Sequence, residues 1–315
     1  QSLNTGLRIT LTGHHKNMPE LQYKDKTADV SEEAIDNAAR AISRARTLII
    51  TSGAGMSVDS GLPDFRGKHG LWQGFAEVEG KTLRTGDLAI TKAFHDDAAQ
   101  AWGFYGRLTT LFRETKPHIG FEILRRWADT VENWYVVTSN VDGHFQRAGF
   151  DPSKIVEIHG TMEKLQCLTP CRPEVWENDQ SFTIDSSTLR SNHVPSCKFC
   201  GGVARPNILL FNDFAWLYRQ SQEQEENFNR FLAQSNSPIT ILEIGAGKLL
   251  PSIRDMNSKA AKKYAATIIR INPHEWEIDA PHISIPDGAA SGLSKIERVL
   301  SKHDLDSSGH QTDYL

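Results

Sequence analysis

The four cysteines of this 315-residue chain fall in two close pairs, Cys167 with Cys171 and Cys197 with Cys200. Two close thiol pairs joined by a loop are the arrangement that a tetrahedral thiolate zinc site needs, because each pair can sit on a tight turn. Four protein ligands leave no open coordination position, so we expect a structural ion and not a catalytic one. A pair of disulfides is the alternative, but nothing in the sequence suggests secretion. His193 is a further candidate ligand.

A glycine-rich segment follows the apolar run Leu48–Ile50, which predicts a buried strand. Gly53 and Gly55 permit a tight turn and a close approach of backbone N–H groups to a pyrophosphate. The segment therefore predicts dinucleotide binding, the alternative being a strand-to-helix turn without a ligand. It does not follow the dehydrogenase pattern G-x-G-x-x-G, because Val58 stands at the third glycine position.

Polar residues also follow two later apolar runs. Asn140 and Asp142 come after Trp134–Thr138, and His159 comes directly after Ile155–Ile158. Open α/β sheets bind ligands at the carboxyl ends of their strands, so these side chains are candidates for a site. A simple turn and a structural histidine are the alternatives. An imidazole, whose ordinary pKa lies near neutrality, suits the removal of a proton from a hydroxyl group.

The segment from Gly53 to Gly67, GAGMSVDSGLPDFRG, resembles the NAD-binding loop of the sirtuins, the NAD-dependent protein deacylases, whose pattern is GAGxSxxSGIPDFRG. Further sirtuin-like motifs follow in family order, and the whole resemblance runs from about residue 31 to residue 302. The resemblance implies NAD as a co-substrate. The residues that it implies for NAD binding are Gly53, Ala54, Gly55, Asp64, Phe65, Arg66, Ser139, Asn140, Asp142, Gly245, Ala246, Gly247, Asn272, Pro273, Gly288 and Ala289.

The same resemblance assigns roles to the central residues. Asn140 would sit against the nicotinamide ribose, Asp142 would accept the carboxamide N–H of nicotinamide, and His159 would be the general base. Ser139 stands where sirtuins usually have glutamine, and Gly245–Gly247 stands where they have GTS, which holds the adenosine half of NAD.

The resemblance also implies an acylated-lysine protein substrate. Sirtuins pair an extended peptide with a segment like RPxVVxFGE, so we expect substrate contacts from Ile208, Leu209 and Phe211, together with Tyr105 of an aromatic helix. Sirtuins that remove acidic acyl groups have Tyr and Arg three positions apart. Because Leu108 stands three positions after Tyr105, we expect neutral acyl groups, acetyl among them, to be preferred.

The implied reaction places the chain among the transferases. It removes an acyl group from lysine and releases nicotinamide, which we also expect to inhibit, and O-acyl-ADP-ribose. Protein ADP-ribosyl transfer or NAD hydrolysis at the same site is the nearer alternative. A non-catalytic NAD sensor is the more distant one, and a base beside the ribose argues against it.

The elements that must position these residues form an α/β fold. We expect a Rossmann-like, mainly parallel sheet with helices on both faces, plus an inserted small zinc-binding and helical domain, with NAD in the cleft between them. Apolar runs predict strands at 48–50, 134–138, 155–158, 239–244 and 268–271. A first helix would be capped by Asp29 and Glu32, and a closing helix would span 288–302.

The expected domain boundaries follow from these elements. An irregular arm covers 1–28, a sirtuin-like catalytic domain covers 29–302, and a polar tail covers 303–315. Within the catalytic domain, the NAD-binding part takes 29–67, 114–160 and 204–302, a helical insert takes about 68–113, and the zinc module takes about 161–203.

Charge and hydropathy exclude several classes of partner. The chain has 39 acidic and 35 basic residues, a net charge of −4 and no long basic run, so we expect no direct nucleic-acid binding. An apolar run of about eighteen residues, the length of a membrane span, does not occur, and the amino end lacks the apolar centre of a secretory signal. We expect no membrane partner and, by default, a cytoplasmic location.

Overall fold

The computed structural model describes residues 29–64, 75–78, 81–235 and 238–308. The expected arm 1–28, and Phe65 and Arg66 of the glycine-rich segment, lie outside these residues. The chain divides into two compact units. We call them the sheet unit (residues 24–62, 115–159 and 219–315) and the cysteine unit (residues 63–114 and 160–218, with 1–23), and describe each by itself.

The sheet unit contains a six-stranded sheet in the order β11-β10-β9-β1-β4-β5, and every neighbouring pair is parallel. Parallel pairing with crossing connections is what alternating apolar strands and helices predict, and the expected mainly parallel α/β sheet is confirmed. Its strands are β1 (Thr47–Ser52), β4 (Asn133–Thr138), β5 (Ile155–Glu157), β9 (Ile239–Ile244), β10 (Thr267–Ile271) and β11 (Ile283–Ile285).

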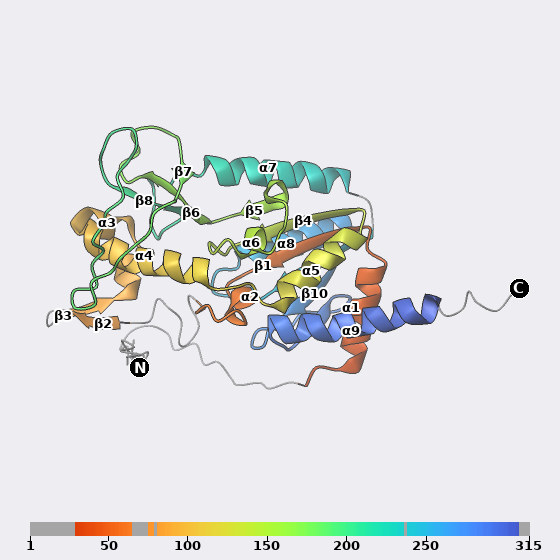
Figure 1. The fold of residues 1–315 in the computed structure, drawn as a ribbon. Helices are drawn as coiled ribbons and strands as arrows, with labels where there is room; N and C mark the ends of the chain where they lie inside the picture. The colour runs from red at the N-terminus through yellow and green to blue at the C-terminus, as the bar shows by residue number, and fades with distance from the viewer. Residues whose placement is uncertain (1–28, 65–74, 79–80, 236–237, 309–315) are drawn as a thin grey trace, which may run out of the picture. The chain divides into compact units, whose positions relative to one another are not determined.

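Helices cover both faces of this sheet (Figure 1). Side chains alternate along a strand, so Leu48 and Ile50 of β1 join the core on one face and Ile49 joins the core on the other. The first core is closed by α1 (Glu32–Ser43), α5 (Ile119–Thr130) and α9 (Ala289–Ser308), and the second by α7 (Arg219–Gln234) and α8 (Ser252–Tyr264). The short α2 (Gly55–Val58), α6 (His144–Arg147) and η3 (Pro152–Lys154) complete the unit.

Two helix boundaries differ from the sequence-based expectation. The cap of α1 is Ser31, whose hydroxyl accepts the N–H of Ala34 at 3.1 Å, and not Asp29. Serine is as good a cap as aspartate, and it stands directly before the first helical residue. The closing helix α9 continues to Ser308, beyond the expected end at Lys302.

In the residues that the structure describes, the cysteine unit is built from short antiparallel strands, two α-helices and one 3-10 helix. A three-stranded sheet has the order β7-β6-β8, and β2 pairs with β3. The elements are β2 (Phe75–Val78), β3 (Lys81–Arg84), η2 (Thr85–Leu88), α3 (Thr91–Asp96), α4 (Ala98–Glu114), β6 (Gly160–Cys167), β7 (Trp176–Glu177) and β8 (Ala204–Ile208).

Aromatic side chains of α3 and α4 form the core of the cysteine unit. Phe94 stacks on Tyr105 with ring centroids 5.2 Å apart, and Trp102 stacks on Phe182 at 4.8 Å. The indole Nε1 of Trp102 donates to the carbonyl of Ala204 at 2.8 Å, which ties α4 to β8. These contacts satisfy the polar group of a large buried aromatic, as burial requires.

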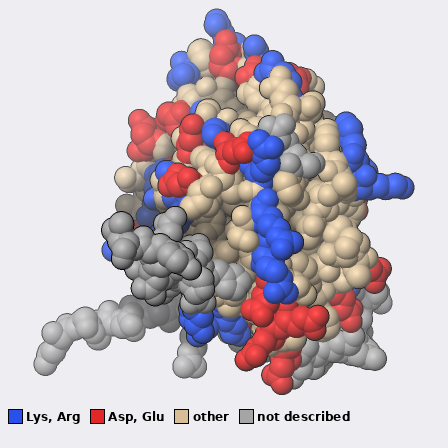
Figure 2. All heavy atoms as spheres, turned by 90° about the vertical axis from the view of Figure 1, so that its right-hand side faces the viewer, with Lys and Arg blue, Asp and Glu red and all other residues tan. Residues whose placement is uncertain are grey.

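Charges of both signs occur on the molecular surface. On the face drawn in Figure 2, Lys and Arg side chains and Asp and Glu side chains are both present, with uncharged surface between them. Within the described residues, no helix combines the length and the apolar character that crossing a membrane requires.

Candidate active site

The predicted site residues of the sheet unit all follow the carboxyl ends of its strands. Because the strands are parallel, these ends lie at one edge of the sheet, which is where such sheets bind ligands. The residues are Gly53, Ala54 and Gly55 after β1, Ser139, Asn140 and Asp142 after β4, His159 after β5, Gly245, Ala246 and Gly247 after β9, Asn272 and Pro273 after β10, and Gly288 and Ala289 after β11.

The glycines after β1 pack directly against the loop after β9. The N–H of Gly55 donates to the carbonyl of Gly245 at 3.1 Å. A Cβ at Gly53 would lie 2.7 Å from the oxygen of Gly245, and one at Gly55 would lie 2.7 Å from its Cα. These distances leave no space for a side chain, so glycine is required for the two loops to meet backbone to backbone.

A chain of hydrogen bonds joins the residues after β1 and β4. The hydroxyl of Ser57 donates to Oδ2 of Asp142 at 2.6 Å and accepts Nδ2 of Asn140 at 3.2 Å. The other carboxylate oxygen, Oδ1, accepts the backbone N–H of His144 at 2.9 Å. Asn140 and Asp142 are each 6% exposed, so these bonds fix both side chains in one buried arrangement.

Ser57 is therefore a further candidate site residue, which the sequence-based assignment did not include. It lies on α2, and its contact with Asp142 spans a separation of 85 residues. A signal for it was present, because Ser57 occupies the fixed serine of the pattern GAGxSxxSG.

His159 is held by the backbone of Ser139. Its Nδ1 lies 3.1 Å from the carbonyl oxygen of Ser139. A carbonyl oxygen can only accept, so Nδ1 carries the proton and, in the neutral ring, Nε2 carries the lone pair. The side chain is partly exposed. This tautomer is the one that a general base acting through Nε2 needs.

Two further histidines, His118 and His144, contact the segments that follow β1 and β4. His118 caps α5, with Nδ1 accepting the N–H of Gly120 at 2.9 Å and Nε2 donating to the carbonyl of Met56 at 2.8 Å. Burial lowers the pKa of His118, although the bond to Met56 opposes this. His144 is fully buried, and burial lowers its pKa as well, against the opposing charge of Asp142. Both imidazoles are thereby favoured in the neutral form.

The loops after β10 and β11 are fixed by their own polar contacts. Oδ1 of Asn272 accepts the N–H groups of His274 and Glu275, at 2.9 and 2.8 Å, and its Nδ2 donates to the carbonyl of Ala246 at 3.1 Å. Near Gly288, Oδ2 of Asp59 accepts the N–H of Ala290 at 2.7 Å in the first turn of α9.

The predicted substrate residues lie in the cysteine unit. Tyr105 is fully buried and donates its hydroxyl to the carbonyl of Leu88 at 3.0 Å, and burial raises its pKa. Its contact with an acyl chain stays a prediction. Ile208 is buried at the end of β8, whereas Leu209 and Phe211 are each 41% exposed. Exposure at alternate positions indicates an extended segment that shows one face to solvent.

A buried ion pair anchors this segment. Arg205 of β8 contacts Asp213 with 2.7 Å between Nη2 and Oδ2, and both side chains are inaccessible to solvent. The carboxylate also accepts the backbone N–H of Ala215 at 3.1 Å. Burial lowers the pKa of Arg205, and the charge of Asp213 opposes this. Asp64, which was predicted to contact NAD, also belongs to the cysteine unit.

The four cysteine sulfurs gather at the end of β6. All of them lie within 4.8 Å of one another, and the Sγ–Sγ distances Cys167–Cys200 and Cys171–Cys197 are both 3.7 Å. A disulfide would need about 2.05 Å, whereas a tetrahedral zinc ion about 2.3 Å from each sulfur would hold them about 3.8 Å apart. The residues therefore fit a structural zinc ion. His193 takes no part in this cluster, since its Nε2 contacts Oε1 of Gln180 at 2.8 Å.

Comparison with known proteins adds the following findings. A model of the Sir2 family matches residues 53–234. The NAD-dependent protein deacylase of Aeropyrum pernix is 32% identical over 242 residues, which are 76% of this chain and 86% of that protein. The NAD-dependent protein deacylase of Aquifex aeolicus is 29% identical, over 80% of this chain and 95% of that protein. A solved Sir2 homologue in complex with NAD matches with a TM-score of 0.64 and 23% identity, over 85% of this chain and 94% of that one.

Proposed function

The chain belongs to the Sir2 family, and on that premise we propose that it is an NAD-dependent protein deacylase that removes acetyl and other neutral acyl groups from protein lysines. NAD is its co-substrate, and an acylated protein is its second substrate. The two relatives named above are NAD-dependent protein deacylases, and this chain matches them over most of their length.

One observation carries the proposal. Polar and glycine residues follow all six strands of the sheet at one edge, and among them the hydroxyl of Ser57 links Asn140 to Asp142 at 3.2 and 2.6 Å. Asn140 would contact the nicotinamide ribose and Asp142 the carboxamide of nicotinamide. Each carboxylate oxygen of Asp142 has a second lone pair beyond the bond it already accepts, so it can still take a ligand N–H.

The reaction that these residues support proceeds in two stages. The bond between nicotinamide and ribose breaks, nicotinamide leaves, and the acyl oxygen of the lysine amide bonds to the anomeric carbon of the ribose. His159 then takes a proton from a ribose hydroxyl through Nε2, and that oxygen attacks the acyl carbon. Addition of one water and departure of the lysine amine give free lysine and O-acyl-ADP-ribose.

The preference for neutral acyl groups is supported by the position of two cations. Arg107 is exposed on α4 while Tyr105 on the same helix is buried, so the two side chains do not share a face. Arg205 is buried, but Asp213 already neutralises it at 2.7 Å. Neither guanidinium is available to pair with the carboxylate of an acidic acyl group.

Leu209 and Phe211 would contact the substrate peptide.

Several further features belong to the same proposal. The four cysteines hold one structural zinc ion. Nicotinamide is both a product and an inhibitor of the reaction, because free nicotinamide can bind again at the position from which it is released. The protein works in the cytoplasm and has neither nucleic acid nor a membrane as a direct partner, which the mixed surface charge supports.

The test is a panel of peptides that share one sequence and differ only in the acyl group on a central lysine. The peptides are incubated with the protein and NAD, and the products are identified by mass spectrometry. Free lysine peptide, nicotinamide and O-acetyl-ADP-ribose are expected from the acetyl peptide, with slower reaction of the succinyl peptide. Faster removal of succinyl than of acetyl would contradict the acyl preference. ADP-ribose on a protein acceptor, or NAD hydrolysis with every acyl peptide untouched, would replace the deacylase assignment.

A further inference from the structure

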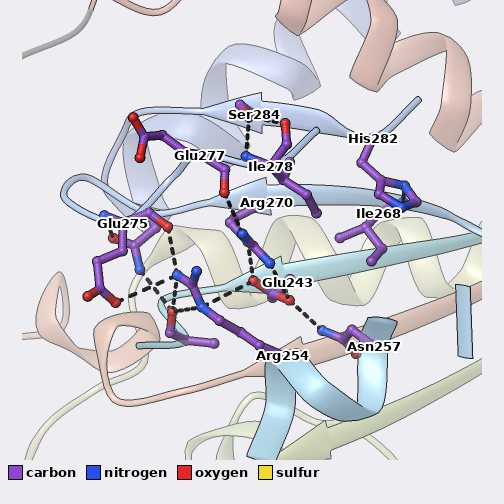
Figure 3. Close-up of polar contacts among 12 residues, drawn as sticks. Glu243, Arg254, Asn257, Ile268, Arg270, Glu275, Glu277, Ile278, His282 and Ser284 are labelled. Atoms are coloured by element: carbon purple, nitrogen blue, oxygen red, sulfur yellow. Dashed lines mark hydrogen bonds and ion pairs between the residues drawn. The ribbon is translucent and has the colours of Figure 1, made fainter. Parts of the chain in front are cut away.

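A buried carboxylate with two arginines lies beneath the loop after β9. Glu243 of β9 is 1% exposed, and its carboxylate accepts from Nε of Arg270 at 2.5 Å and from Nδ2 of Asn257 at 2.9 Å (Figure 3). Nε of Arg254 lies 3.8 Å from the same carboxylate. A buried carboxylate is stable only when cations and donors surround it, so Glu243 holds both guanidinium groups in fixed orientations.

In this orientation, Arg254 donates hydrogen bonds to two backbone carbonyl groups. Its Nε and Nη2 donate to the carbonyl of Ala246, at 3.0 and 2.7 Å, and Nη2 also donates to the carbonyl of Glu275 at 2.6 Å. With the bond from Asn272, the carbonyl of Ala246 accepts three hydrogen bonds. Arg254 thus connects the loop after β9 with the loop after β10.

The placement of Arg254 on its helix points to this role. It lies in the first turn of α8, which begins at Ser252. A cation near a helix N-terminus opposes the helix macrodipole, so the helix itself gains nothing from an arginine there. The side chain is 9% exposed, and its contacts lead away from the helix to the two loops.

The loop that Arg254 holds is the one on which the glycines after β1 rest. Gly245 and Ala246 meet Gly53 and Gly55 backbone to backbone, with no space for a Cβ between them. A shift of the carbonyl of Ala246 would therefore displace both glycine-containing loops at once. Glu275 limits such a shift as well, because its carboxylate accepts the N–H of Lys248 at 2.7 Å.

Taking from the proposed function that NAD binds at these loops, and from the sirtuin resemblance that its adenosine half lies at Gly245–Gly247, we propose that Arg254, oriented by Glu243, is a positioning residue for that half of NAD. It fixes the carbonyl of Ala246 and so sets Gly245–Gly247 against Gly53 and Gly55. Arg254 itself need not touch the nucleotide.

The test compares two variants. Arg254→Met keeps an unbranched side chain of similar length and removes every donor, and Arg254→Lys restores the charge and a single donating nitrogen. Calorimetry on the purified proteins should give dissociation constants for NAD and for ADP-ribose that are about tenfold higher in Arg254→Met, because a charge-assisted hydrogen bond is worth about that factor. Arg254→Lys should fall between that variant and the wild type. The KM for NAD should rise in parallel, while the KM for the acetyl peptide and the inhibition constant of nicotinamide stay close to those of the wild type.

The matched control is Ile253→Val, a buried position on the same turn of α8 that should lower stability without changing the loops. Unchanged NAD affinity in Arg254→Met, an equal loss in Ile253→Val, or a wild type that binds no NAD would overturn the inference. If Arg254→Met does not fold, the dissociation constant of Arg254→Lys decides in the same way. A wild type that binds NAD but removes no acyl group would refute the deacylase assignment and leave the role of Arg254 to be judged on binding alone.

Discussion

A backbone carbonyl contributes to the orientation of His159. The carbonyl of Ser139 accepts its Nδ1–H at 3.1 Å, while the hydroxyl of Ser139 turns to the carbonyl of Ser52 at 3.3 Å. The contact with His159 therefore comes from the backbone of residue 139 and not from the serine side chain that stands in place of the usual sirtuin glutamine. Nε2 keeps its lone pair, and the imidazole can act as a base whatever side chain residue 139 carries.

Replacing His159 by alanine should separate binding from turnover. His159→Ala removes the base and leaves the loops after β1 and β9 intact, so the dissociation constant for NAD should change little. The deacylation rate should fall by about a hundredfold to ten-thousandfold, which is the usual contribution of one positioned base. Stopped assays with the acetyl peptide give the rate, and calorimetry gives the affinity. His95→Ala, at an exposed histidine of α3, is the control. Wild-type turnover in His159→Ala would remove the proposed base.

The sequence indicated the candidate site residues one by one, with Ser57 as an exception, but it did not indicate the contacts between them. Asn140, Asp142 and His159 follow apolar runs, so the sequence alone suggested that they lie at strand ends. The bond from Ser57 to Asp142 and the contact between Arg254 and Ala246 depend on how α2 and α8 pack, which no local pattern encodes. Arg254 also stands in a helix turn where its charge is unfavourable, and such local exceptions are often functional sites.

At the scale of elements, the predictable strands were those with continuous apolar runs. β1, β4, β9 and β10 are buried along almost their whole length, so their residues are mostly apolar or small, with Glu243 and Arg270 as the charged exceptions, and the sequence located all four. β11 was missed because Ser284 separates its two isoleucines, which leaves no apolar run. β6 was missed because it carries Glu163, Lys164 and Gln166 between its apolar residues. The mixed polar and apolar sequence of β6 reflects its pairing with β8 and β7, and not burial against a single apolar core.

His118 and His144, at the N-termini of α5 and α6, should make the free energy of unfolding depend on pH. Burial holds the pKa values of His118 and His144 below the ordinary value near 6.5. Below about pH 6.5 the unfolded chain therefore binds protons that the folded chain does not, so the free energy of unfolding falls as the pH falls toward the lowered values. Above pH 6.5 both states are neutral and these two groups add no slope. Urea unfolding between pH 7.5 and 5.5 measures the effect.

A variant at the cap of α5 isolates the contribution of His118. His118→Asn retains a side-chain acceptor for the N–H of Gly120, since asparagine is a good helix cap, and it removes the titrating ring. The slope of unfolding free energy against pH should then be smaller than in the wild type. His95→Asn, which replaces an exposed histidine, should keep the wild-type slope. An unaltered slope in His118→Asn would mean that His118 contributes nothing to the dependence.

At the scale of the whole molecule, the two units divide the chemistry between them. The sheet unit carries the proposed NAD-binding loops at the ends of its strands, and the cysteine unit carries the cysteine cluster and the exposed segment at Leu209 and Phe211. The long connections inside the cysteine unit have few apolar residues, so the metal has to supply what a larger core would. Zinc loss should therefore affect the two units unequally.

Removing one zinc ligand tests this division. Cys197→Ser should lose the zinc, and amide hydrogens of β6 and β8 should exchange faster by about 100-fold or more, because binding of a structural zinc ion is part of the folding free energy. Amides of β1 and β9 should keep most of their protection, and NAD should still bind, while deacylation is lost. Hydrogen exchange read by mass spectrometry, zinc analysis and calorimetry give the three readouts, with Ser196→Ala as the neighbouring control. Equal loss of protection in β1 and β6 would show that the two units unfold together, and a purified wild type without stoichiometric zinc would refute the metal assignment.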